Sequence, residues 1–250
     1  MENGMDIARF NFSHGDHEEQ KGRVDMIKEL REELDMPIAM LLDTKGPEIR
    51  TGKLKDGKKV QLEAGETFTL TTDEIVGDNK IVSITYKGLV EDVKAGSTIL
   101  IDDGLIEMTV EEIRGEEIVC RVINGGFVSN HKGVNVPGAI LSMPYISEVD
   151  LADIIFGVEH GFDFIAASFV RNADAIVEIK QMLEVAGSNI KVIAKIENEE
   201  GIENLDAIIE ASDGIMVARG DMGVEIDFAE IPAIQKHLID RAMSAGKICI

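Results

Sequence analysis

The chain has 250 residues, enough for one large domain or two ordinary ones, and its 44% hydrophobic content can fill a core. Its 25 Lys and Arg residues oppose 47 Asp and Glu residues, which gives a formal net charge of −22 at pH 7. Because a negative field repels nucleic acid and acidic membranes, this charge argues against both as partners. A phosphate-bearing substrate would need a local group of cations or a divalent metal ion.

The two cysteines, Cys120 and Cys249, form no CxxC pair. The sequence therefore predicts neither a disulfide framework nor a thiolate zinc site, and it favours a cytoplasmic location. No apolar stretch approaches the roughly 20 residues that a membrane helix needs, and the first four residues do not resemble a signal peptide.

The first 46 residues alternate strand and helix patterns. Residues 7–12 and 38–42 are apolar runs typical of buried strands. Between them, apolar residues at helical spacing predict a helix, lined by Val24, Ile27, Leu30 and Leu34.

Between about residues 48 and 143 the hydrophobic period falls to two, as in Ile106/Met108/Val110, with turn signals such as Arg114-Gly115. This pattern predicts an antiparallel β domain over residues 48–143, inserted between two parts of a βα domain at residues 1–47 and 144–250. Pro47 and Pro144 are predicted to be hinges.

From Phe162 onward the strand and helix patterns return. Strands are expected at residues 164–167, 192–194, 215–218 and 248–250, with helices between them, including one face shared by Ile202, Leu205 and Ile209. Strand followed by helix is the rhythm of a parallel sheet or a βα barrel. A closed barrel needs eight strands, so the chain is expected to be incomplete at both ends.

Lys195 and Glu197 stand two apart at the end of a predicted strand, so their side chains should point the same way at the edge where βα barrels place active sites. An interior salt bridge is the structural alternative. Asp221, in Arg219-Gly220-Asp221, follows the next strand. Two carboxylates at one edge suit Mg²⁺, although Gly-Asp is also an ordinary turn signal.

Polar residues also end the first strand, where Arg9, Asn11 and Ser13 alternate and His14-Gly15 follow. Helix capping by Ser13 or Asp16 and a structural ion pair of Arg9 would explain them without a ligand. Several cations could bind phosphate and so answer the requirement set by the net charge: Arg9, Arg50, Lys132 and Lys195.

Four motifs, taken in this order, resemble pyruvate kinase: Ala8-Arg9-Phe10-Asn11-Phe12-Ser13-His14-Gly15, Leu41-Leu42-Asp43-Thr44-Lys45-Gly46-Pro47-Glu48-Ile49-Arg50, Lys195 to Glu197, and Ala218-Arg219-Gly220-Asp221. The resemblance covers essentially the whole chain. It implies an α/β fold, a partial TIM (β/α)8 barrel with an inserted antiparallel β-barrel lid, and phosphoryl transfer from phosphoenolpyruvate to ADP. It also implies a homotetramer for the full-length protein, with the first, last and most of the seventh barrel strands and a C-terminal domain outside these residues.

The resemblance also implies roles for individual residues. Lys195 would stabilise the transferred phosphoryl group, and Arg9 would hold the substrate phosphate. Glu197 and Asp221 would bind Mg²⁺, while Arg219, Gly220 and Asp221 would contact the substrate. The K⁺ ligands would be Asn11, Ser13, Asp43 and Thr44, with Glu48 typical of K⁺-dependent members. Nucleotide contacts would come from Asn11, Phe12, Ser13, His14, Arg50 and Lys132.

Two other functions fit the residues alone. One is a Mg²⁺-dependent barrel lyase or aldolase acting on an oxo acid, which would form no ATP. The other is a non-catalytic fragment whose β domain folds independently.

Overall fold

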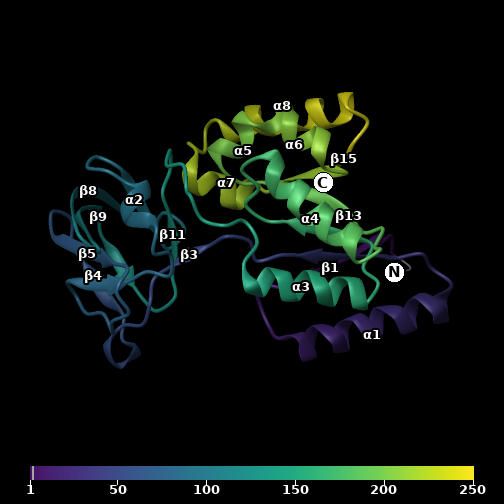
Figure 1. Cartoon of the computed structure of the whole chain (residues 1–250), viewed down its shortest axis with the longest axis horizontal. Helices are drawn as coiled ribbons and strands as arrows, with labels where there is room; N and C mark the ends of the chain where they lie inside the picture. Colours follow the sequence, from purple (N-terminus) through teal and green to yellow (C-terminus); the bar gives the residue numbers. More distant parts are fainter. Residues whose placement is uncertain (2) are drawn as a thin grey trace.

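A six-stranded parallel sheet forms one half of the molecule (Figure 1). In the computed structural model, which describes residue 1 and residues 3–250, its strands lie in the order β1-β2-β12-β13-β14-β15. Their bounds are Ile7–Asn11, Ala39–Asp43, Phe164–Ala167, Lys191–Ile196, Gly214–Val217 and Ile248–Cys249. All five pairings are parallel. The expected strands are thus confirmed within a residue or two, and the sheet is a partial TIM barrel.

Helices cover the outer face of this curved sheet (Figure 1). They are α1 (His17–Leu34), α3 (Glu148–Glu159), α4 (Ala173–Val185), α6 (Leu205–Ala211) and α8 (Ile231–Ser244), while the short helices α5 (Glu199–Glu203) and α7 (Arg219–Glu225) lie on the side toward the inserted part. Alternate strand residues such as Phe10, Leu42 and Ala194 pack against them in one apolar core. The strand residues that alternate with this set point to the opposite, inner face of the sheet.

Two local differences from the sequence prediction lie in the helices. Ile202 and Leu205 lie on two separate helices, because the helix is interrupted at Asn204, between α5 and α6. The Asn204 side chain donates to the Arg171 carbonyl. The Arg219-Gly220-Asp221 segment, for which a turn was one interpretation, begins helix α7 instead.

The inserted part forms a second body with its own apolar core (Figure 1). Its seven-stranded sheet has the order β3-β11-β7-β8-β9-β5-β6, and β4 pairs with β10. These strands are Ile49–Arg50, Gly133–Asn135, Thr98–Ile101, Ile106–Arg114, Glu117–Asn124, Thr67–Thr71, Ile81–Ser83, Val60–Leu62 and Gly126–Val128. Short helices lie at Lys55–Gly57 (η1) and Leu89–Asp92 (α2). The pairing is antiparallel as expected, except that β5 and β6 run parallel.

One hydrogen bond crosses from this inserted part to helix α7. The Asn135 side chain on β11 donates to Glu225 Oε1 at 3.0 Å. Within the described residues, no helix combines the length and the apolarity that crossing a membrane requires.

Candidate functional site

The inner face of the parallel sheet carries charge at the carboxyl ends of its strands. Arg9 and Asn11 on β1 alternate with the core residues Ala8 and Phe10, so they point to the inner side. Asn11 pairs in register with Asp43, the last residue of β2. The same alternation turns the Lys195 side chain of β13 inward.

Arg9, Asp43 and Lys195 meet Glu197, the residue directly after β13, in what we call the charged quartet. Lys195 Nζ lies 2.9 Å from Glu197 Oε1 and 3.1 Å from Asp43 Oδ1. Arg9 Nε donates to Asp43 Oδ2 at 2.6 Å. Asp43, Lys195 and Glu197 are buried, whereas the Arg9 side chain is 54% exposed. The structure therefore joins two sequence motifs that the inserted part separates, and it contains the ion pairs that the structural alternatives anticipated.

Ser168, directly after β12, contacts two members of the quartet, Lys195 and Asp43. Its hydroxyl accepts from Lys195 Nζ at 2.8 Å and donates to the Thr44 carbonyl at 2.7 Å, and its N–H donates to Thr44 Oγ1 at 3.1 Å. The next residue, Phe169, has a φ of +54° and donates its N–H to Glu197 Oε2 at 2.6 Å. The Phe169 N–H and the Ser168 hydroxyl thus hold Glu197 and Lys195 in place.

Burial and the neighbouring charges together shift the pKa values of Glu197 and Lys195. Burial raises the pKa of Glu197 to about 7, even though the Lys195 ammonium and the Phe169 N–H act in the opposite direction. Burial also disfavours the charge on Lys195, but the Glu197 and Asp43 carboxylates outweigh it and raise the pKa of Lys195. Lys195 is therefore held as a cation at neutral pH.

The turn after β1 brings the other predicted residues to the same edge. The Ser13 N–H donates to Asn11 Oδ1 at 3.0 Å, and His14 is exposed. Phe12 differs from its neighbours, because its ring packs against Phe156 and Phe162 in the core and its N–H donates to the Asp43 carbonyl at 3.0 Å. Asp16 caps helix α1 by accepting from the Glu19 N–H, as one interpretation expected.

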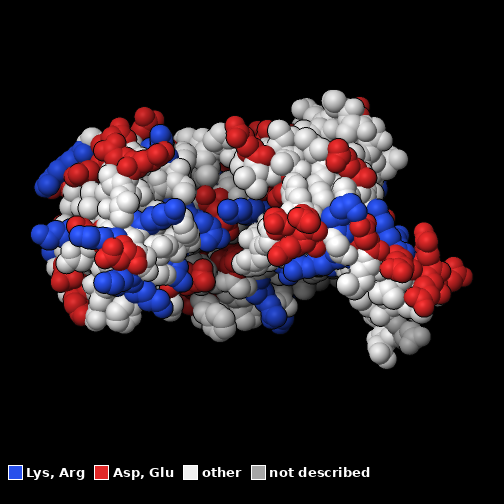
Figure 2. Space-filling view, turned by 90° about the horizontal axis from the view of Figure 1, so that it is seen from below, with Lys and Arg blue, Asp and Glu red and all other residues white. Residues whose placement is uncertain are grey.

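A cleft of about 860 Å³ separates the sheet from the inserted part. Three predicted site residues, Arg50, Lys132 and Asp221, line it. Arg50 is held by Glu48 through two bonds of 2.8 and 3.1 Å, and Lys132 lies 2.7 Å from Asp102. Figure 2 shows side chains of both charges around the hollow between the two bodies. The quartet does not line this cleft.

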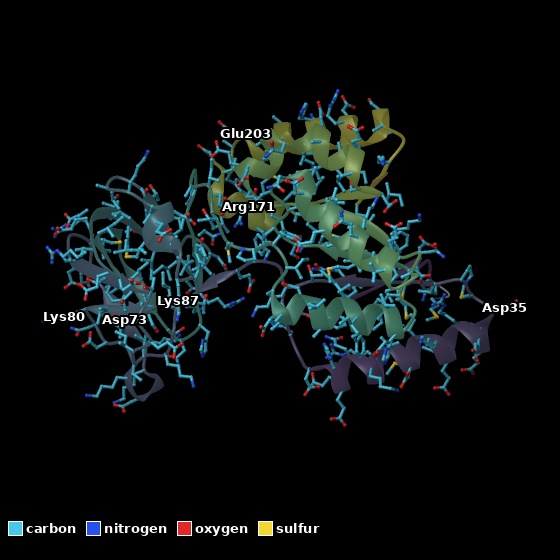
Figure 3. The ribbon with its side chains drawn as sticks, in the orientation of Figure 1. Asp35, Asp73, Lys80, Lys87, Arg171 and Glu203 are labelled. Carbon is cyan, nitrogen blue, oxygen red and sulfur yellow. The ribbon has the colours of Figure 1, made fainter. Side chains whose placement is uncertain are left out.

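Further charged residues of the parallel-sheet body line the same cleft. Figure 3 shows Arg171 and Glu203 on the side that faces the inserted part. Arg219 and Gly220 start helix α7, and a Cβ built on Gly220 would meet no atom within 4 Å. The space beside the Gly220 backbone is therefore open.

The residues for a magnesium ion are two carboxylates rather than a closed cage. Among the described residues, no group of three or more His, Cys, Asp or Glu side chains is arranged to hold a metal. Glu197 Oε1 is buried and has no hydrogen-bond partner of good geometry in that part of the chain. Asp221 is near enough to raise the pKa of Glu197. This donor set fits Mg²⁺, which commonly takes one or two carboxylates and fills its other positions with substrate oxygens and water.

Ser168 and Phe169 are the contacts that sequence reasoning missed. A polar residue immediately after the apolar run 164–167 is the same signal that indicates Lys195 and Glu197, so the sequence pattern also indicates Ser168. The positive φ of Phe169 has no such signal, because aromatic residues seldom adopt it.

A partial βα barrel with a β domain inserted after its second strand, and with a charged cluster at the carboxyl ends of its strands, defines a βα-barrel protein whose candidate site lies where this fold places active sites. Comparison with known proteins narrows this class. The family described as "Pyruvate kinase, barrel domain" matches residues 1–250. The chain therefore belongs to the pyruvate kinase family.

Individual relatives agree. A pyruvate kinase of Clostridium perfringens is 50% identical over 249 residues, covering 99% of this chain and 52% of that protein. One from Bacillus licheniformis is 50% identical over 250 residues, which is 43% of its length. The crystal structure of a pyruvate kinase from Cryptosporidium parvum superposes with a TM-score of 0.95 at 41% identity, covering 99% of this chain and 52% of that one. The chain spans about half the length of the curated relatives it matches.

Proposed function

We propose that the protein containing this chain is a pyruvate kinase, which transfers the phosphoryl group of phosphoenolpyruvate to ADP and yields pyruvate and ATP. The observation that carries the proposal is Lys195, a buried ammonium held among Asp43, Glu197 and Ser168 at the carboxyl end of the sheet. Phosphoryl transfer asks a protein mainly to position the reactants and to stabilise charge on the transferred oxygens, and a fixed cation does both.

The charge balance of the quartet indicates what else the reaction needs. A metal ligand must be deprotonated, and with Glu197 ionised the two positive charges of Arg9 and Lys195 are balanced by the two negative charges of Asp43 and Glu197. In that state the quartet alone offers no net attraction to a phosphate. Asp221 adds a further carboxylate nearby. Extra positive charge is therefore required at this edge, and cations bound by the carboxylates would supply it.

We assign the Mg²⁺ ligands to Glu197 and Asp221 and the K⁺ ligands to Asn11, Ser13, Asp43 and Thr44. These side chains present mainly carboxylate, amide and hydroxyl oxygens, which suit hard cations. A bound Mg²⁺ would supply charge neutralisation on the phosphoryl oxygens. Glu48 supports the assignment of K⁺ dependence, because a glutamate at this position is typical of K⁺-dependent members of the family.

The protein groups have separate tasks in this proposal. Arg9, which is half exposed and pairs with Asp43, holds the substrate phosphate. The buried Lys195, on the other oxygen of Asp43, stabilises the phosphoryl group during transfer. The open backbone at Arg219 and Gly220 binds the substrate carboxylate. The nucleotide lies along the Asn11–His14 turn and toward Arg50 and Lys132.

We assign residues 48–143 as a lid domain between barrel parts at residues 1–47 and 144–250. Each body has a separate apolar core, and a cleft lies between them. Closure of such a lid would exclude water and limit hydrolysis of the transferred group. A cytoplasmic location and a homotetrameric full-length protein complete the proposal.

The test is ATP formation from phosphoenolpyruvate and ADP with Mg²⁺, with and without K⁺, in this chain and in the whole protein that contains it. Lys195→Ala should reduce the rate at least a hundredfold, because the charge-stabilising cation is lost. Lys191→Ala is the matched control, since Lys191 lies at the opposite end of β13 with its side chain 58% exposed. Absence of ATP in a well-folded whole protein would exclude the proposed function.

A further inference from the structure

One buried side chain outside the predicted site residues reaches the Asn11–His14 turn from behind. Gln20, in the first turns of helix α1, is 1% exposed. Its amide nitrogen donates to the Asn11 carbonyl at 3.0 Å and to the His14 carbonyl at 2.9 Å. A primary amide has two N–H groups, so both donors are used on the two ends of one turn.

These contacts decide which atoms of the turn remain available to a ligand. The carbonyls of Asn11 and His14 are bound on the α1 side. Asn11 pairs in register with Asp43 of the adjacent strand β2, and the Ser13 N–H donates to Asn11 Oδ1. Gly15, with φ +79°, then turns the chain into α1. The turn is therefore held by its backbone while Asn11 and Ser13 keep their places at the mouth.

The energetic case rests on burial. A buried amide that loses its partners costs more than a hydrogen bond that is never made, and a carboxylate in its place would oppose two carbonyl oxygens. Gln20 Oε1 already has no hydrogen-bond partner among the described residues. The amide nitrogen thus provides the compensation for burying this side chain, which makes Gln20 intolerant of replacement by an isosteric acceptor.

We propose that Gln20 is a positioning residue for the reaction. It clamps the Asn11–His14 turn from behind, and so fixes the oxygens that take a monovalent cation and the groups that face the nucleotide. This role rests on the proposed function, because the turn acts on cation and nucleotide only if they bind there. Gln20 itself touches neither.

Two variants test the clamp: Gln20→Met, which removes the donors, and Gln20→Glu, which replaces them with acceptors. The control is Gln181→Met, the same change at an exposed position of α4. Amide hydrogen exchange followed by mass spectrometry on this chain should show at least tenfold faster exchange in the peptide over residues 11–15 for both Gln20 variants. Gln181→Met should leave it unchanged. Equal exchange in wild type and Gln20→Met would overturn the proposal.

Kinetics on the whole protein separate positioning from simple loss of fold. For Gln20→Met, the K⁺ concentration at half-maximal rate and the KM for ADP should each rise about tenfold, as expected for about 1.4 kcal/mol lost from the turn. The kcat at saturation and the KM for phosphoenolpyruvate should stay within about twofold. A lower kcat with unchanged K⁺ and ADP constants would contradict a positioning role. If wild type forms no ATP but the exchange result holds, the clamp stands and the proposed function fails.

Discussion

Asp43 Oδ1 lies 3.1 Å from Lys195 Nζ, although the whole inserted part separates the two residues in the chain. Asp43 also binds Arg9, so one carboxylate pairs with a cation from the adjacent strand β1 and with one from β13, two strands away on the other side. The contact depends on the parallel register, which aligns Asn11 with Asp43 and places Ser168 between β2 and Lys195. The geometry of the charged quartet is therefore a property of the sheet.

Asp43→Asn should destabilise the chain by about 2–4 kcal/mol, because breaking a buried ion pair leaves the cationic partner uncompensated. Denaturation in urea followed by circular dichroism measures the change. Asp25→Asn is the control, since it alters an exposed pair with Lys21 that should contribute nothing measurable. Equal stability of Asp43→Asn and wild type would mean that solvent compensates Lys195 and Arg9.

Gly46→Ala should cost about 2 kcal/mol or more in the free energy of unfolding. Gly46 has φ +74°, and an added Cβ would lie 2.8 Å from the Ser168 carbonyl oxygen. The control is Gly187→Ala, with φ +65° and no atom within 4 Å of the added Cβ, which should cost about 1 kcal/mol from backbone strain alone. Urea denaturation compares the two, and equal losses would remove the steric part of the argument.

Asn135→Ala should loosen the inserted part, because it removes the donor to Glu225 on α7. A hydrogen bond of about 1 kcal/mol corresponds to roughly a fivefold larger population of separated bodies. Small-angle X-ray scattering should then report a larger radius of gyration. Asn124→Ala, which removes a bond to Leu105 within the inserted part, should leave it unchanged. Identical scattering for Asn135→Ala and wild type would show that other contacts hold the bodies together.

Asp213→Asn should lower stability by about 1–2 kcal/mol at pH 7 and by less in acid. Burial acts to raise the pKa of Asp213, but the Val192 N–H and Lys180 outweigh it and lower the pKa below the usual 3.8. A carboxyl with a lowered folded-state pKa stabilises the fold above its unfolded pKa, and loses that contribution as pH falls through the folded value.

The difference in unfolding free energy between wild type and Asp213→Asn should therefore be constant from pH 7 to about pH 5 and should shrink below about pH 3.8. Asp240→Asn, an exposed change on α8, provides the baseline. A difference that grows on acidification would have the wrong sign for the proposed pairing.

Much of the parallel sheet was predictable because its signals are local. The run 164–167 coincides with β12, and the helix pattern through Val24 and Leu34 lies within α1. Hydrophobic period identifies such elements without knowledge of their neighbours. The parallel pairing of β5 with β6 was not predictable in this way, because period two is the same for either strand direction.

In the candidate site too, the residues indicated by local sequence were predictable, whereas the contacts that depend on tertiary structure were not. Lys195, Glu197 and Asp43 could be proposed because each follows an apolar run, yet the bond from Lys195 to Ser168 depends on register between strands. Gln20 reads as one more polar residue of an exposed helix. Its burial follows from how α1 packs beneath the turn after β1, which is a tertiary property.

Helix α7 has a consequence for the thermodynamics of the whole chain. Asp221 in its first turn lines the cleft, and Glu225 in its last turn accepts the bond from Asn135. The seven residues of α7 therefore connect the position of Asp221 to the inserted part at Asn135. If a ligand at Asp221 binds one arrangement of the two bodies more tightly, reciprocity requires that favouring this arrangement tighten the ligand by the same factor.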